Sequence, residues 1–192
     1  MNFDTLFQFE KDLAKYTGAP FVVVTDGCTH AVELCLRHDR PQFLAFSAFT
    51  YLSIPMLMHH LGINYVLTSE EWTGEYQFHG TRIWDSARRL EPGMYRAGQM
   101  QCLSFSYGKP LHLGKCGAIL LDDEDAYRTL SAWRADGRDL HQPSWESGIF
   151  TPGFHYCPTL ETCKQGSVAL QTFVAQCQQA IYPDCRNITI VR

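Results

Sequence analysis

Apolar positions follow two different periods along this chain. Between residues 3 and 16, Phe3, Leu6, Leu13 and Tyr16 recur at the spacing of one helix face, and Gly18 with the proline after it ends the segment. The next run, FVVVTD at residues 21–26, is short, apolar and rich in valine, which is typical of a buried strand. The chain therefore begins with a predicted helix followed by a predicted strand.

The same two patterns alternate over the rest of the chain. We predict helices at 29–37, 50–61, 123–138 and 160–181, and strands at 42–47, 63–69, 82–87, 101–106 and 117–123. The stretches 70–81 and 141–158 are rich in turn residues and are predicted to be irregular. Alternating strands and helices predict an α/β fold of three α/β/α layers around a mostly parallel sheet, with residues 1–192 forming a single unit.

Composition fits one ordinary globular unit. Of the 192 residues 45% are hydrophobic and 19% are charged, and the net charge is −4 without any basic block. A nucleic-acid partner is therefore not expected, because a phosphate backbone attracts clustered Lys and Arg. The first residues lack the basic start and apolar run of a signal peptide, and no apolar stretch could span a bilayer. We predict a cytoplasmic protein that does not contact a membrane.

Cysteine and histidine are frequent, but they do not show metal-ligand spacing. The eight cysteines include no CxxC pair, so a zinc knuckle or a thioredoxin-like motif is not expected. The simplest interpretation is free thiols in a reducing compartment, and a disulfide framework is the alternative. The histidines show no ligand spacing either, and we predict no metal site.

Four turns that follow predicted strands carry polar or aromatic residues: TDGCTH, SAFTY, WDSAR and SFSYGK. In open α/β sheets ligands bind at the carboxyl ends of the strands, so chemistry is expected in these turns. Lys109 follows a strand and lies between Gly108 and Gly114, where a partly buried amine could act as a nucleophile. Asp85 ends a strand and could point into a cleft. Position alone leaves open a surface lysine and an ordinary helix cap.

Five segments in order resemble the DegT/StrS family of pyridoxal-phosphate (PLP) dependent sugar aminotransferases, which have the type I aminotransferase fold. They are FEKDLAKYTGAPFVVVTDGCTHAVELCLR, SAFTYLSIPMLMHHLGINYVL, IWDSARRL, LSFSYGKPLHLGKCGAILLDD and GFHYCPTLETCKQGSVAL. Each segment is a weak signal by itself, whereas the five together span most of residues 9–175. The fourth carries the family's Ser-Phe-x-x-x-Lys pattern and is the most specific of them.

The resemblance implies two catalytic residues. Lys109 would form the Schiff base with PLP and shuttle the proton between substrate and cofactor. Asp85 would hold the pyridine nitrogen protonated, so that the ring can accept electrons from the substrate.

The resemblance also implies a set of cofactor-binding residues. The phosphate would be bound at the start of the helix that contains Cys28 and Thr29, with a second hydroxyl from Ser104. Tyr51 matches the ring-stacking position. Arg88 stands where the family has Gln or His beside the phenolic oxygen, and His155 replaces an asparagine that reaches the neighbouring subunit's phosphate.

These features predict a PLP-dependent aminotransferase that acts as a homodimer. It would move an amino group from an amino acid donor to a keto acceptor such as a keto-sugar. The family's C-terminal small domain is expected to be absent, because the sequence stops soon after the helix that precedes it. Two alternatives stay open: another PLP reaction, such as decarboxylation or elimination, and an inactive protein of the PLP fold that only binds.

Overall fold

The structure is a computed structural model that describes residues 3–143 and 151–188. Five α-helices and nine strands are found in this part of the chain. The helices are α1 (Asp4–Thr17), α2 (Cys28–Asp39), α3 (Ser53–Leu61), α4 (Glu124–Arg134) and α5 (Leu160–Leu170). The strands are β1 (Phe21–Thr25), β2 (Phe43–Ser47), β3 (Asn64–Thr68), β4 (Tyr76–Gln77), β5 (Ile83–Asp85), β6 (Arg89–Leu90), β7 (Met100–Ser104), β8 (Gly117–Leu121) and β9 (Gln176–Cys177).

The main sheet has five strands in the order β1-β8-β7-β5-β4. β5 and β7 are parallel, while β8 is antiparallel to both β1 and β7, and β4 is antiparallel to β5. β1, β5 and β7 therefore run in one direction and β4 and β8 in the other. The α/β class is confirmed, but the sheet is mixed where the sequence predicted mostly parallel strands. The physical reason is that residues 78–82 turn the chain directly from β4 into β5, and residues 105–116 turn it from β7 into β8, so that each pair is antiparallel.

A second, parallel pair continues the sheet beyond β4. β2 and β3 pair in register from Phe43 with Asn64 to Ser47 with Thr68. An isolated antiparallel bridge between Ala45 and His79 joins this pair to the chain just after β4. The last pairing, β6 with β9, links the middle of the chain to its C-terminal part.

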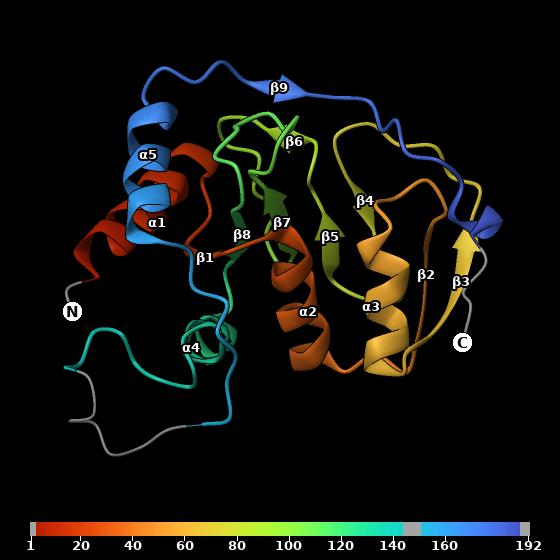
Figure 1. Ribbon diagram of the computed structural model, residues 1–192, viewed down its shortest axis with the longest axis horizontal. Helices are drawn as coiled ribbons and strands as arrows, with labels where there is room; N and C mark the ends of the chain where they lie inside the picture. Colours follow the sequence, from red (N-terminus) through yellow and green to blue (C-terminus); the bar gives the residue numbers. More distant parts are fainter. Residues whose placement is uncertain (1–2, 144–150, 189–192) are drawn as a thin grey trace.

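Two hydrophobic cores lie on opposite faces of the sheet, because side chains alternate along each strand. In β1, Val23 packs toward one core with α2, α3 and α4, while Val22 and Val24 pack toward the other with α1 and α5. Ile119 and Ala118 in β8 divide in the same way. The three-layer arrangement predicted from the sequence is confirmed, and Figure 1 shows α1 and α5 set apart from α2 and α3 across the sheet.

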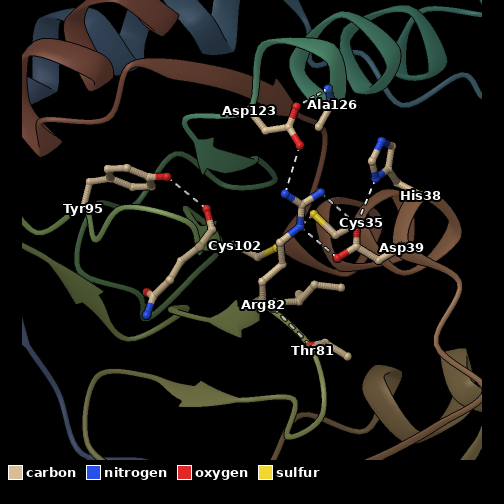
Figure 2. A network of polar contacts seen from close by, with 11 residues as sticks. Cys35, His38, Asp39, Thr81, Arg82, Tyr95, Cys102, Asp123 and Ala126 are labelled. Atoms are coloured by element: carbon tan, nitrogen blue, oxygen red, sulfur yellow. Dashed lines mark hydrogen bonds and ion pairs between the residues drawn. The ribbon is translucent and has the colours of Figure 1, made fainter.

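Arg82 connects β5 to the helices α2 and α4, at the end of β5 opposite to Asp85. Its guanidinium donates to both carboxylate oxygens of Asp39, each at 3.0 Å, and to Asp123 Oδ2 at 2.9 Å, as Figure 2 shows. Asp39 ends α2, and Asp123 caps α4 by accepting from the Ala126 amide at 3.0 Å. Arg82 precedes β5, so the network fixes this strand against two helices.

The predicted helix 160–181 is wrong beyond Leu170. Residues 171–188, which we call the strap, leave α5 and follow the edge of the sheet toward which the arrows of β3, β5 and β7 point (Figure 1). Its backbone bonds elsewhere: the Gln178 amide donates to the Arg88 carbonyl at 2.8 Å, and the Ala180 amide donates to the Trp72 carbonyl at 3.1 Å. These tertiary hydrogen bonds override the helical pattern. Within the described ranges no helix has both the length and the apolar character needed to cross a bilayer.

Candidate active site

A cavity of about 690 Å³ opens at the carboxyl ends of β1, β5 and β7, where α/β sheets commonly bind ligands. Loops after three strands and the start of α2 form its walls. Seven of the eight residues predicted for the site line it: Cys28, Thr29, Tyr51, Asp85, Arg88, Ser104 and Lys109. Lys109 and Asp85 thus share one hollow, although 24 positions separate them in the sequence.

Asp85 ends β5 and is 4% exposed. Its Oδ1 accepts from the Ala87 amide at 3.0 Å and its Oδ2 from the Tyr76 hydroxyl at 3.1 Å. Burial raises the pKa of Asp85, while the positive charge of Lys109 and these two donors act in the opposite direction. The Tyr76 hydroxyl also contacts Thr50 Oγ1 at 2.7 Å. Hydrogen bonds from Thr50 through Tyr76 therefore hold the Asp85 carboxyl group in position.

Lys109 lies in the loop after β7, and Gly108 beside it takes a positive φ of 73°. Its amine donates a hydrogen bond to the Tyr182 hydroxyl and lies 5.1 Å from the centre of that ring. Tyr182 belongs to the strap, 73 positions later. The Lys109 amine therefore lies between the loop after β7 and the strap, where it lines the cavity and is not free in solvent.

The start of α2 forms one wall of the cavity. Gly27 is the N-cap and no side chain caps this helix end, so its first amides remain available to an anion. Gly117 lies so close that a Cβ there would be 2.5 Å from the Cys28 nitrogen, which explains the glycine at the start of β8. Thr29 Oγ1 contacts Ser53 Oγ at 2.6 Å, which brings two hydroxyls to the same wall.

Cys28 is placed as a wall residue and not as a nucleophile. Its thiol donates to the Cys102 carbonyl at 3.6 Å, and burial raises its pKa well above the usual value. A thiol held protonated in this way is a poor nucleophile. All eight cysteines of the chain are free thiols in the structure.

Arg88 carries a buried polar atom without a partner. Its Nη1 donates to Gln178 Oε1 at 3.2 Å, while its Nε is buried and makes no hydrogen bond within the described part of the chain. The guanidinium lies 5.0 Å from the centre of the Tyr182 ring. Tyr51 stands on the other side of the cavity with 62% of its surface exposed, and its ring centre is 6.2 Å from that of Tyr182.

His155 does not line this cavity. Its side chain is 88% exposed and pairs with Asp136 at 3.1 Å, beside the bridge between Ala135 and His155. The predicted contact of His155 with a neighbouring subunit's phosphate involves a second chain, and it stays a prediction.

Sequence reasoning missed several residues of the site. Tyr182 lies just after the segment 160–181 that was predicted as helix, and Tyr76 lies in a stretch predicted as irregular. Ser53, His30 and Lys115 also contribute to the cavity wall. His30 and Lys115 follow Gly27 and Gly114, so their positions in turns after strands were the only available signal.

Comparison with solved structures identifies the architecture. DesI, crystallised in the presence of its TDP-sugar product, aligns with a TM-score of 0.72 and 17% identity over 88% of this chain and 53% of its own. PseC from Helicobacter pylori, an aminotransferase of pseudoaminic acid biosynthesis, gives 0.69 and 12% over 87% and 57%. A protein from Streptococcus pneumoniae described as a sugar aminotransferase, in its PLP form, gives 0.69 and 19% over 88% and 59%.

The fold is the type I fold of PLP-dependent aminotransferases. The chain spans between 53% and 60% of the length of the solved structures it matches. No protein-family model matches the sequence, and no curated protein matches it. At identities of 12–19% the likeness concerns the fold, and the cavity described above supplies the chemical argument.

Proposed function

We propose that this chain is a PLP-dependent aminotransferase, and that it moves an amino group from an amino acid to a keto acceptor of the keto-sugar type. One observation carries the proposal: Lys109 and Asp85 line a single cavity at the carboxyl edge of a type I aminotransferase fold. The amine and the carboxylate are the two protein groups on which PLP chemistry depends most, because one holds the cofactor covalently and the other sets its electronics.

The residues present fit this cofactor. The uncapped start of α2 offers amides and a helix dipole to its phosphate, with the Thr29, Ser53 and Ser104 hydroxyls at the same cavity. The unpartnered Nε of Arg88 supplies a buried donor that a bound oxygen could satisfy. The carboxyl group of Asp85, with both oxygens oriented by fixed donors, can accept a hydrogen bond from a protonated ring nitrogen.

Within this proposal each side chain has a defined task. Bound PLP stabilises negative charge developing at the substrate's α-carbon. Asp85 holds a proton at the ring nitrogen by providing a buried negative charge. The Lys109 amine would move the proton between the substrate's α-carbon and the cofactor carbon. Tyr51, on the exposed side of the cavity, would cover the ring.

The test is whether PLP is captured by Lys109. Purified protein is mixed with PLP, reduced with borohydride and digested, and the adduct is located by mass spectrometry. We expect the adduct on Lys109, and its loss in Lys109→Ala. Lys164→Ala is the matched control, because Lys164 is exposed on α5 and away from the cavity. A folded wild-type protein without an adduct on Lys109 would refute the proposal.

Partners and location complete the proposal. We propose a homodimer that uses small-molecule donor and acceptor substrates in the cytoplasm and does not bind nucleic acid or membranes. We propose also that residues 1–192 form one cofactor-binding unit. Two exposed aromatic side chains, Tyr51 (62%) and Tyr107 (85%), stand at the cavity and support a subunit contact there.

A further inference from the structure

The strap contributes an aromatic ring, that of Tyr182, to the lining of the cavity. Tyr182 contacts the cavity's two main cations: its hydroxyl accepts from Lys109, and its ring lies 5.0 Å from the Arg88 guanidinium. Its ring also stacks on Trp72 at 6.1 Å with an interplanar angle of 27°. The Tyr182 side chain therefore contacts both the amine and the arginine to which the proposed function assigns contacts with PLP.

The strap is fixed on both sides of Tyr182. Before it, Gln178 and Ala180 are bound through their backbone to Arg88 and Trp72. After it, the Cys185 amide donates to the Ala48 carbonyl at 2.9 Å, and its thiol donates to the Thr50 carbonyl at 3.4 Å. Tyr182 thus lies in the cavity as part of an ordered segment. Two apolar side chains of the strap are largely exposed to solvent: Ile181 is 79% exposed and Val174 is 75% exposed.

The bond between Tyr182 and Lys109 has a chemical consequence. An amine that donates to a phenol gains hydrogen-bond stabilisation, which must be given up before its nitrogen attacks a carbonyl. Arg88 is engaged by the same ring, so one side chain occupies two of the proposed cofactor contacts.

We propose that Tyr182 is an internal occupant of the Lys109 site, and that the strap must move it aside before a cofactor ring can bind. The inference rests on the proposed function for the identity of the ligand, but the masking of the Lys109 amine does not depend on it. Binding then requires the fraction of molecules in which the strap is displaced, and the apparent affinity for PLP falls by that fraction.

The first experiment uses the cofactor-free protein and so is independent of PLP. Wild type, Tyr182→Phe, Tyr182→Ala and Val174→Ala are treated with a small acylating reagent, and the rates at Lys109 and Lys164 are followed by mass spectrometry. We expect Lys109 to react several-fold faster in both Tyr182→Phe and Tyr182→Ala, because both remove the hydroxyl that accepts from the amine. Lys164 should react alike in all four proteins. Val174→Ala, on the same strap but away from the cavity, should behave as wild type.

The second experiment measures PLP binding by its absorbance in the same four proteins. We expect Tyr182→Ala to bind PLP about tenfold more tightly than wild type, which corresponds to removing one hydrogen bond and one cation–π contact, that of Arg88, from the closed state. Equal or weaker binding, together with an unchanged rate at Lys109, would overturn the inference while leaving capture on Lys109 intact. A faster rate at Lys109 without PLP capture in any variant supports the masking and refutes the proposed function.

Discussion

At the scale of single residues, Asp85 is a carboxyl group whose burial in the folded chain disfavours its ionised form. It is 4% exposed, and burial raises its pKa. The folded chain therefore holds a proton at Asp85 more tightly than the unfolded chain, whose carboxyl titrates at about pH 3.9. The resulting stability is fully present below that pH and is lost as the pH rises through the higher folded pKa. At neutral pH the ionised carboxylate lowers the stability of the cofactor-free protein.

Replacing this carboxylate should separate stability from function. In the cofactor-free protein we expect Asp85→Asn to raise the free energy of unfolding at pH 7 by about 1 kcal/mol. The gain should shrink toward pH 4, and urea denaturation at both pH values measures it. The same variant should bind PLP more weakly. Asp184→Asn is the control, because Arg186 lowers the pKa of Asp184. Removing the Asp184 charge should therefore not raise the free energy of unfolding. A less stable Asp85→Asn at pH 7 would mean that the bonds from Tyr76 and Ala87 outweigh burial.

Some site residues could be found in the sequence and others could not. Asp85 and Ser104 are the last residues of β5 and β7, and Lys109 lies in the loop after β7. The rule that ligands bind at strand ends pointed to these turns, and the resemblance to the family selected the three residues. Tyr182 and Tyr76 lack that signal, because their positions depend on contacts with segments far away in the chain. Tyr182 in particular meets Lys109 across 73 positions, and no local pattern encodes that distance.

At the scale of elements, a buried ion pair joins α1, β1 and α4. Arg134, 1% exposed, donates to Glu10 and to the Val24 carbonyl at 2.7 Å, while the Val24 amide donates to Glu10 Oε1 at 2.9 Å. We expect Arg134→Met to lower the free energy of unfolding by about 3–5 kcal/mol, because it leaves the Glu10 charge buried and unpaired. Chemical denaturation at pH 7 measures the loss.

A second substitution should recover much of that loss. In the double variant with Glu10→Gln, a neutral amide can still accept from the Val24 amide and can donate to its carbonyl, so we expect more than half of the stability to return. Arg128→Met is the control, since its pair with Glu124 is 71% and 60% exposed and should contribute less than about 1 kcal/mol. A double variant as unstable as Arg134→Met would show that packing of the arginine, and not the unpaired charge, is responsible.

Helices and strands were predicted best where the pattern reflects burial on one face. The α1 end at Gly18 and the α3 end at Gly62 were both located, and both glycines take the left-handed conformation that ends a helix, with φ of 79° and 66°. Residues 171–181 of the strap were mistaken for helix because their apolar residues have helical spacing, although the backbone there bonds to Trp72 and Arg88. The short strands β4, β6 and β9 have two residues each, too few to show any period.

At the scale of the whole molecule, the alternation of strands and helices fixed the three layers but not the direction of every strand. Direction depends on where the connection returns the chain: residues 86–99 bring it back to start β7 parallel to β5, whereas residues 105–116 turn it directly into β8, antiparallel to β7. The loop between β7 and β8 contains Lys109, so the antiparallel turn of the sheet and the position of the candidate amine have the same origin. The cavity lies between this loop and the start of α2.

The exposed side chains around the cavity give the last prediction, which concerns assembly. Tyr107 is 85% exposed and Tyr51 is 62% exposed, both line the cavity, and side chains of this kind in one region mark a contact surface. We expect a homodimer at micromolar concentration in sedimentation equilibrium, and Tyr107→Glu should weaken it at least about tenfold by placing a charge in the interface. Val168→Glu is the control, since Val168 is 61% exposed on α5, whose residues do not line the cavity. If the wild type is monomeric, or if only Val168→Glu dissociates the dimer, a subunit contact at the cavity is wrong.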